Sequence, residues 1–386
     1  MGDKISNGLP FDDQAMLDEI KSWVEIETPT EDAVAVNRLV DKIETEATAA
    51  GATTKRIAGK EVAPGRKYGD LLLVASPWGG EEPGVLVVSH IDTVHPKGTL
   101  GGGLPFRVEG NTAYGPGIYD MKGGAVIAFA ALCHLIRSGG RTKLPVRHLF
   151  VSDEEVGSPT SRALIEEEAR RARYVFVTEP ARDGGKIVTS RKGGTASFNL
   201  QVTGRSAHSL GPQDGRSAVL ELARQILDLD SMNDYDRGLL LNIGVIGGGT
   251  STSIVPEHAF AKISMSSPDA ELTEEVIARV LALKSYDPDV LIEVTAKRGR
   301  HPGYEKTPEI DTLFQHARKL AAEIGFDLVG VNGPIGGDAN FTAQFAPTLD
   351  GMGPDGQGAH SHQEQIVISS LIPRATLLLR LFETLG

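Results

Sequence analysis

Histidine and acidic residues directly follow three short apolar segments of this chain, and this pattern limits the possible fold more than any other feature. The segments and the residues after them are 84–89 before His90 and Asp92, 148–152 before Asp153, Glu154 and Glu155, and 174–178 before Glu179. Short apolar segments that are separated by helical ones predict parallel strands buried on both faces. In such α/β sheets the functional crevice lies at the carboxyl ends of the strands. We therefore expect these side chains at one edge of the sheet, with the ligand chemistry of a divalent metal.

The periodicity changes near residue 191 and changes back near residue 299. Residues 197–203 alternate between polar and apolar, which is typical of a half-exposed antiparallel strand. A helix, two strands, a second helix and a last strand are predicted between this strand and residue 298. Together they form a strand–helix–strand–strand–helix–strand series, which is the split βαβ arrangement. We expect an α/β catalytic domain, formed by residues 1–191 and 299–386, with a mixed, mostly parallel sheet covered by helices. An inserted α+β domain of residues 192–298 interrupts it.

Charge and cysteine content exclude several classes of protein. The formal net charge is −12 and no cluster of Lys and Arg is present, which argues against a nucleic-acid partner. Cys133 is the single cysteine, so a metal site has to use imidazole and carboxylate ligands. No stretch approaches the roughly 18 apolar residues of a membrane span, and the N-terminus lacks the apolar core of a secretory signal. We expect a cytoplasmic protein without a membrane partner.

Three local patterns indicate how the candidate ligands act. His90 and Asp92 lie on the same side of an extended segment, so that Asp92 can orient the imidazole. Asp120 lies in a glycine-rich loop before an apolar helix, where one carboxylate can bridge two ions. Glu154 and Glu155 point in opposite directions if the backbone is extended, so one can bind metal while the other faces substrate.

Five segments together resemble the co-catalytic metallopeptidase family of glutamate carboxypeptidase, aminoacylase, acetylornithine deacetylase and succinyl-diaminopimelate desuccinylase. They are Ser89-His90-Ile91-Asp92-Thr93, 115–124, Asp153-Glu154-Glu155 with Gly157-Ser158, Thr203-Gly204 with Ser206-Ala207-His208, and Gly336-Gly337-Asp338-Ala339. The resemblance runs from residue 84 to the end of the chain. Glutamate carboxypeptidase is the most similar member, judging from residues 92–98 and 105–110.

The resemblance implies a role for each matching residue. His90 and Glu179 hold one metal, Glu155 and His360 hold the other, and Asp120 bridges them. Glu154 is the general base for a metal-activated water. His208, from the inserted domain, stabilises the developing oxyanion. The resemblance also implies one or two divalent ions per subunit (Zn, Co or Mn), and a homodimer through the inserted domain, which acts as a lid and dimerisation domain.

Two other histidines compete with the expected ligands. His362 follows the same loop as His360, although the register of Gly358-Ala359-His360 favours His360. His95 lies near His90 in the sequence and is a further candidate. The remaining histidines are expected to be ordinary surface or core residues.

The inserted domain departs from the family pattern. In the register of Ile254-Val255-Pro256, Ser253 stands where most relatives have Asn, and Ser266 stands near the position of an Arg that binds the substrate's carboxylate. A serine cannot replace that bidentate, charged group. Another cation could take over its function, and the candidates near in sequence are Arg191, Lys192, Arg205 and Arg216.

We compare three functions with these observations. The first is hydrolysis of the amide bond of a small N-acyl amino acid or peptide-like substrate. The second is the same chemistry on a non-peptide C–N bond, of a small amide or an aromatic amine, which the absence of the Arg favours. The third is a binding protein on a hydrolase scaffold. It predicts the loss of a ligand or of the base, whereas Asp120, Glu154, Glu179 and His360 are all present.

Overall fold

The computed structural model describes residues 9–80, 82–191, 193–299, 301–333 and 336–386. The chain divides into two compact units, which are described separately here. Within the described residues, the first unit contains the chain up to Ser190 together with Tyr304–Asn332 and Gly336–Gly386. Within the same described residues, the second unit contains Arg191–Gly303 and Gly333. Lys192 lies outside the described residues.

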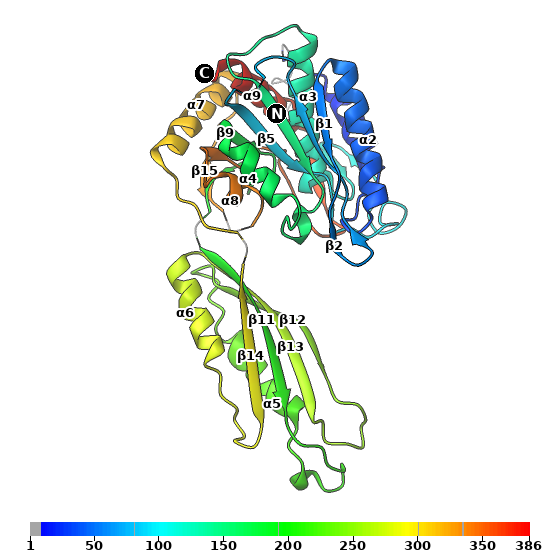
Figure 1. Cartoon of the computed structure of the whole chain (residues 1–386), viewed down its shortest axis with the longest axis vertical. Helices are drawn as coiled ribbons and strands as arrows, with labels where there is room; N and C mark the ends of the chain where they lie inside the picture. Colours follow the sequence, from blue (N-terminus) through cyan, green and yellow to red (C-terminus); the bar gives the residue numbers. More distant parts are fainter. Residues whose placement is uncertain (1–8, 81, 192, 300, 334–335) are drawn as a thin grey trace. The chain divides into compact units, whose positions relative to one another are not determined.

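A six-stranded sheet with the order β1-β4-β8-β5-β9-β16 forms the centre of the first unit (Figure 1). Strands β8, β5, β9 and β16 pair in parallel, whereas β4 pairs antiparallel with β8, and β1 antiparallel with β4. All seven residues of β5 are buried, as expected for a central strand covered on both faces. The sheet is therefore mixed and mostly parallel, as predicted. Its strands are β1 Thr53–Ile57, β4 Leu71–Ala75, β5 Gly84–His90, β8 Val146–Val151, β9 Ala172–Val177 and β16 Thr348–Leu349.

Seven α-helices are described in the first unit. Helix α3 packs against β5, β8 and α9, while α4 packs against β5, β9 and α8. Side-chain caps fix the starts of α1, α2 and α7, where Asp12, Asp32 and Thr307 accept backbone N–H groups. The helices are α1 Asp13–Val24, α2 Ala33–Ala50, α3 Gly123–Arg137, α4 Arg162–Arg170, α7 Pro308–Ile324, α8 Ala339–Thr342 and α9 Leu371–Thr384.

Short strands and turns complete the first unit. A second sheet has the order β17-β18-β7-β6, and two strand pairs, β2-β3 and β10-β15, lie outside both sheets. These strands are β2 Glu61–Ala63, β3 Arg66–Lys67, β6 Arg107–Glu109, β7 Thr112–Tyr114, β10 Ile187–Ser190, β15 Gly330–Asn332, β17 Gly356–Gln357 and β18 Gln365–Val367. A π-helical turn covers Ile118–Lys122, and 3-10 turns cover Glu154–Val156 and Ile368–Ser370.

The helical segment Ile118–Arg137 is long and apolar enough to cross a membrane by length and composition alone. This differs from the sequence-based expectation, because the π-helical turn and α3 join into one segment of 20 residues. However, 83% of its apolar window is buried inside the protein. The burial is that of a core helix, as predicted for an apolar helix that packs against the sheet.

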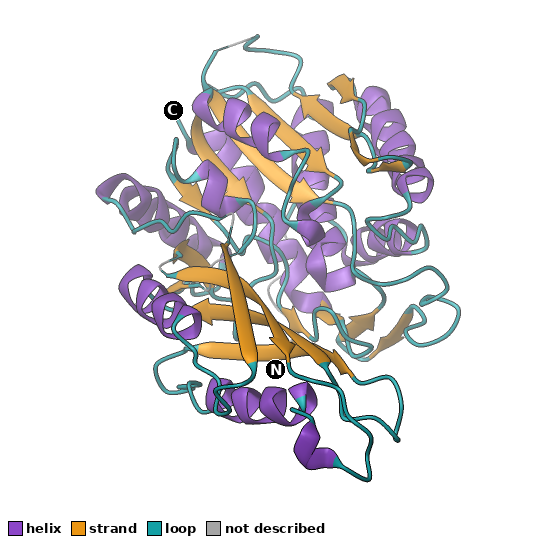
Figure 2. Cartoon of the chain, turned by 60° about the horizontal axis from the view of Figure 1, so that its bottom comes forward, coloured by secondary structure: helices purple, strands orange, loops and turns teal. Residues whose placement is uncertain are grey.

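The second unit is a four-stranded antiparallel sheet of order β12-β13-β11-β14 (Figure 2). Phe198, Leu200 and Val202 of β11 face a core that also contains residues of α5 and α6, so both helices pack on the same face of the sheet. This is the split βαβ arrangement that the sequence predicts. The elements are β11 Gly194–Thr203, a 3-10 turn Pro212–Asp214, α5 Ala218–Asp230, β12 Leu240–Gly248, β13 His258–Ser267, α6 Ala270–Leu281 and β14 Leu291–Arg298.

His148 is buried at the centre of β8 and is expected to make the fold sensitive to acid. Its Nε2 lies 2.7 Å from the Ser89 hydroxyl oxygen, and burial lowers the pKa of the imidazole to about 3. Because the unfolded chain binds a proton near pH 6.5 and the folded one does not, this contribution to stability is full above pH 6.5 and is lost toward pH 3. Between pH 7.5 and 5.5, the native protein should lose about 1.4 kcal/mol more free energy of unfolding than His148→Leu. Urea unfolding at both pH values measures the difference, and equal losses would contradict this prediction.

Candidate metal centre

The predicted ligands of the first unit meet at the carboxyl end of the sheet. His90 is the last residue of β5, Glu155 lies in the turn after β8, and Glu179 follows β9. Two groups of side chains bring their potential ligand atoms within 4.8 Å of one another. One contains His90, Glu154 and Glu179, and the other contains His90, Asp120 and Glu155.

Asp120 lies between two imidazoles. Its Oδ1 is 3.1 Å from His90 Nε2, and its Oδ2 is 3.2 Å from His360 Nε2. Burial alone would raise the pKa of Asp120, but the contacts with His360 and His90 hold it well below its usual range. The two carboxylate oxygens therefore face two different histidines, which is the arrangement that a bridging ligand needs.

Glycines bring this loop close to the strands. Gly117 has a φ of 70°, and a Cβ on it would lie 2.4 Å from Thr93 Cγ2. A Cβ on Gly124, at the start of α3, would lie 1.9 Å from the carbonyl oxygen of Thr178. Because only glycine permits both the left-handed backbone and the close approach, the glycine-rich motif is what places Asp120 beside His90.

His360 completes the second pair of side chains. Its Nε2 lies 3.0 Å from Glu155 Oε2, and hydrogen bonds to Asp120 and Glu155 raise the pKa of His360 to about 10. The competing His362 packs its ring against Gly103 instead. The Nε2 of His95, the other candidate, lies 2.5 Å from Glu364 Oε2.

Asp92 contacts both His90 and the turn that carries the two glutamates. The nearest acceptor to His90 Nδ1 is the backbone oxygen of Asp92, at 3.0 Å, while its carboxylate oxygen Oδ1 lies 3.5 Å away. The same carboxylate accepts the backbone N–H groups of Glu154 and Glu155, each at 3.3 Å. Asp92 thus positions the turn of the glutamates as well as the histidine.

Glu154 lies beside His90 and Glu179, and its carboxylate is more basic than that of an ordinary glutamate. Burial raises the pKa of Glu154 well above its usual range, and the nearby carboxylates of Glu179 and Asp338 add to this against the opposing effect of His90. A carboxyl group of this kind can take up a proton and hold it through a reaction step.

The donor set fits divalent cations. Glu155 Oε1 is buried without a hydrogen-bond partner, which leaves a desolvated carboxylate oxygen for a positive ligand. The imidazoles of His90 and His360 both have raised pKa values, so protons supply the positive charge that the surrounding carboxylates require. Divalent metals replace such protons at imidazole and carboxylate ligands.

Two buried acids near the centre have structural contacts that the sequence interpretation did not assign. Asp338 Oδ1 accepts the Ser158 hydroxyl at 2.5 Å, and burial raises the pKa of Asp338 to about 7. Glu364 contacts the loop of Asp120. The available signals were the Gly-Gly-Asp motif for Asp338 and, for Glu364, its position four residues after His360.

His208 belongs to the second unit, where it is exposed and forms a bridge with Ile254. Its Nδ1 accepts the backbone N–H of Leu210 at 3.1 Å, which places the imidazole proton on Nε2. Its predicted role therefore stays a prediction, with a tautomer suited to donating a hydrogen bond.

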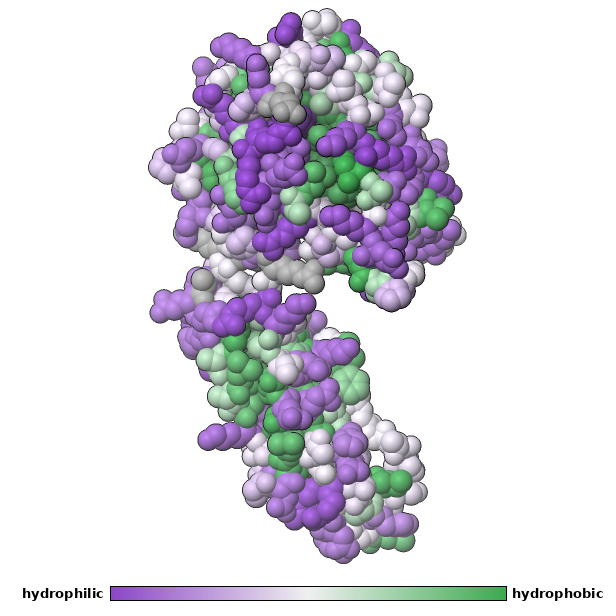
Figure 3. Space-filling model, viewed as in Figure 1, coloured by the Kyte–Doolittle hydropathy of each residue, from purple (hydrophilic) through white to green (hydrophobic). Residues whose placement is uncertain are grey.

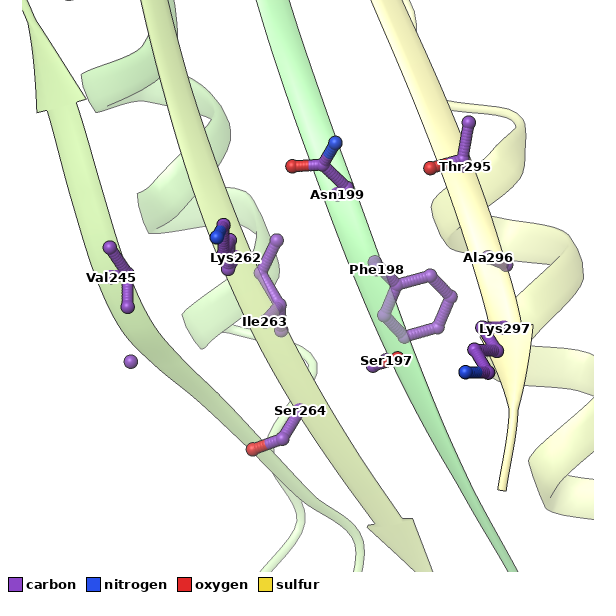
Figure 4. A pocket seen from close by; sticks show the side chains of 11 residues that line it. Ser197, Phe198, Asn199, Val245, Lys262, Ile263, Ser264, Thr295, Ala296 and Lys297 are labelled. Carbon is purple, nitrogen blue, oxygen red and sulfur yellow. The ribbon is translucent and has the colours of Figure 1, made fainter. Parts of the chain in front are cut away.

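The face of the second unit's sheet away from the helices holds an open pocket of about 630 Å³ (Figure 4). Lys262 and Lys297 line it among small polar residues that include Ser197, Asn199 and Ser264. Ser266 is half-buried and lies two residues after Ser264, on the same face of β13. Its partners on the neighbouring strands are Thr195 and Leu240, which are uncharged.

The cations that were near in sequence are engaged elsewhere. Arg216 contacts Asp287 and Asp289, and Arg205 donates to the backbone oxygen of Asp214. Arg191 is buried.

Comparisons with known proteins agree with this architecture. The sequence profile of Peptidase family M20/M25/M40 matches residues 86–384. Carboxypeptidase G2 from Pseudomonas sp. (strain RS-16) is 32% identical over 367 residues, which cover 93% of this chain and 86% of that protein. Two solved structures share the fold. Aminopeptidase PepT from Bacillus cereus has a TM-score of 0.75 at 21% identity, covering 96% of this chain and 98% of its own. A tripeptidase from Staphylococcus aureus has a TM-score of 0.76 at 20% identity, with the same coverage.

Proposed function

The chain belongs to Peptidase family M20/M25/M40, whose members are divalent-metal-dependent hydrolases of peptide bonds, and we propose that it cleaves the amide bond of a small N-acyl amino acid or peptide-like substrate. The observation that carries the proposal is the position of Asp120 between His90 and His360, with Glu154 beside them. Carboxylates concentrated in a buried place are costly unless positive charge compensates them, which bound cations would supply.

The contacts support a division of the ligands between two ions. His90 and Glu179 would hold one ion, Glu155 and His360 would hold the other, and Asp120 would contribute one oxygen to each. Zinc, cobalt and manganese all accept imidazole and carboxylate ligands. A cation bound there lowers the pKa of water and polarises the scissile carbonyl.

Glu154 acts as the general base in this proposal. It takes the proton of the attacking water and later gives it to the nitrogen of the leaving group. Burial and the neighbouring acids raise the pKa of Glu154, which makes its carboxylate a stronger base than an ordinary glutamate. Asp92 keeps the glutamate turn and His90 in place, and in this proposal His208 offers a hydrogen bond from its Nε2–H to the developing oxyanion.

A release assay tests the proposed function. The metal-reconstituted enzyme is given N-acyl amino acids, dipeptides, simple amides and aryl amines, and free amino acid and ammonia are measured separately. Free amino acid that disappears in Glu154→Gln is the expected result. Ammonia, or no amino acid from any acylated substrate, would instead support the second candidate, a hydrolase of non-peptide C–N bonds. The uncharged cross-strand partners of Ser266, Thr195 and Leu240, favour that candidate.

Substitution of Ser266 by Arg separates the two candidates. If the substrate carries a free α-carboxylate, Ser266→Arg should raise kcat/KM by about 10- to 100-fold, because a charge-assisted hydrogen bond contributes roughly 1.5–3 kcal/mol. The matched control is Ser264→Arg, two residues earlier on the same face of β13. If neither variant raises kcat/KM for any acylated amino acid, the pocket has diverged beyond this position. The first candidate function, hydrolysis of N-acyl amino acids, then loses its support.

The proposal includes a homodimer formed through the second unit. Its surface carries exposed apolar side chains, visible as green areas among polar residues (Figure 3). The exposed apolar residues of this unit include Leu227 of α5, 70% exposed, and Ile246 of the edge strand β12, 63% exposed. β12 contains no charged residue, whereas the opposite edge strand β14 contains Glu293, Lys297 and Arg298. Charged side chains protect an edge strand from pairing, so β12 is the edge that a second copy would extend.

Ile246→Lys is expected to convert the dimer into a monomer. A charge at this edge would face the partner copy at a desolvated position, which interfaces tolerate poorly. Light scattering after size exclusion should give about twice the chain mass of 41.1 kDa for the native protein and the single mass for the variant. Leu291→Lys on β14, which replaces a residue 56% exposed, is the control and should stay dimeric. A monomeric native protein would contradict the proposal.

A further inference from the structure

Glu364 is an almost fully buried acid between two segments that carry proposed metal ligands. It is 1% exposed and directly precedes β18, four residues after His360. The segment from Gly358 to Glu364 therefore has the exposed imidazole near one end and the buried carboxylate at the other. A buried carboxylate needs several donors to offset its desolvation.

The Glu364 carboxylate accepts four hydrogen bonds from two other segments. Oε1 accepts the backbone N–H groups of Tyr119 and Asp120, both at 2.9 Å. Oε2 accepts the backbone N–H of Gly117 at 3.0 Å and the His95 imidazole at 2.5 Å. Each is charge-assisted, and such bonds are about twice as strong as neutral ones.

These four bonds join the segments that carry three of the proposed ligands. His95 belongs to the loop that follows His90, and Tyr119 and Asp120 belong to the loop of the bridging carboxylate. The backbone N–H of Asp120 itself is bound, so the position of its side chain depends directly on Glu364. Glu364 in turn is tied to His360 by the short segment between them.

We propose that Glu364 is a positioning residue that aligns Asp120 with His360 and thereby sets the affinity of the centre for divalent metal. The proposal rests on the proposed metal ligands. It goes beyond them because Glu364 contacts their backbone and the His95 ring rather than a metal. Outer residues that orient ligands typically change metal affinity by roughly 10–100-fold when they are substituted.

The test is a Co²⁺ titration of the metal-free protein, followed by visible absorption, in the native chain and in Glu364→Gln. Glutamine keeps the size of the side chain but turns an amide donor toward the backbone N–H groups. We expect Co²⁺ to bind about 10–100-fold more weakly, with an altered absorption spectrum. The metal-free proteins are also compared by thermal unfolding.

Glu168→Gln is the matched control. Glu168 is a buried acid of the same unit, 2% exposed, and its Oε2 lies 3.0 Å from Arg147 Nε at the start of β8, the end opposite to the ligands. It should lower the unfolding temperature without changing Co²⁺ affinity. If Glu364→Gln shows this same pattern, its role is only structural and the proposal is overturned.

A second variant keeps the proposal testable if Glu364→Gln does not fold. His95→Leu removes one of the four donors and should weaken Co²⁺ binding about 2- to 10-fold, the effect of one hydrogen bond. Unchanged affinity in His95→Leu would overturn the proposal. A native protein that binds no Co²⁺ would instead refute the proposed metal centre, so the two failures are distinguishable.

Discussion

Glu154→Gln is expected to abolish turnover while the protein keeps its metal. Glutamine has nearly the same shape as glutamate but cannot accept the proton of the attacking water. General acid–base catalysis contributes about 10²–10⁴-fold, and the loss should reach the upper end because one carboxyl group serves as base and then as acid. The raised pKa of Glu154, caused first by its burial, is consistent with this exchange.

The measurement is kcat together with the metal content of the purified variant. Metal content decides the role, because the potential ligand atoms of Glu154, His90 and Glu179 lie within 4.8 Å of one another. If Glu154→Gln loses metal, Glu154 is a ligand and the assignment as base is wrong. Glu167→Gln, an equivalent change at an exposed site on α4, should alter neither quantity.

The main sheet and the meeting of the ligands could be predicted because each depends on local sequence. β5 begins as a continuous apolar run and ends on His90, so the edge of the sheet where the imidazole lies is determined once the strand is known to be parallel. The apolar helix 123–137 and the alternating strand near residue 198 are equally local signals, and both are present.

The rest depends on pairing between distant residues. Strands β6, β7, β17 and β18 have two or three residues each, and they form a sheet only because segments about 250 residues apart meet. Periodicity cannot be read from so few residues. The contacts of Glu364 have the same origin, since its partners Gly117, Tyr119 and Asp120 lie about 245 residues away in the sequence. The side chain of Asp92 was predicted to orient His90, and its bonds to the glutamate turn could be seen only in the folded chain.

Asp120→Ala is expected to remove both metal and turnover. With the bridging carboxylate, each proposed ion has three protein ligands, which is the usual number at catalytic sites. Without it, His90 with Glu179 and His360 with Glu155 would leave two ligands for each ion. The loss of affinity should exceed the roughly 10–100-fold that outer residues cause. Metal analysis after dialysis should therefore find less than one ion per chain, and activity at ordinary metal concentrations should fall to background.

The comparison of this variant with Glu154→Gln is what assigns the two roles. Loss of the base and loss of the bridging ligand both abolish turnover, so activity alone cannot separate the two roles. Metal content can, because Glu154→Gln is expected to keep its metal and Asp120→Ala to lose it. Excess metal should restore part of the activity of Asp120→Ala, because weak sites fill at high concentration, but none of the activity of Glu154→Gln. If Asp120→Ala keeps two ions per chain, its contacts with His90 and His360 are only hydrogen bonds of the metal-free protein, and the two-metal centre has to be built from other ligands.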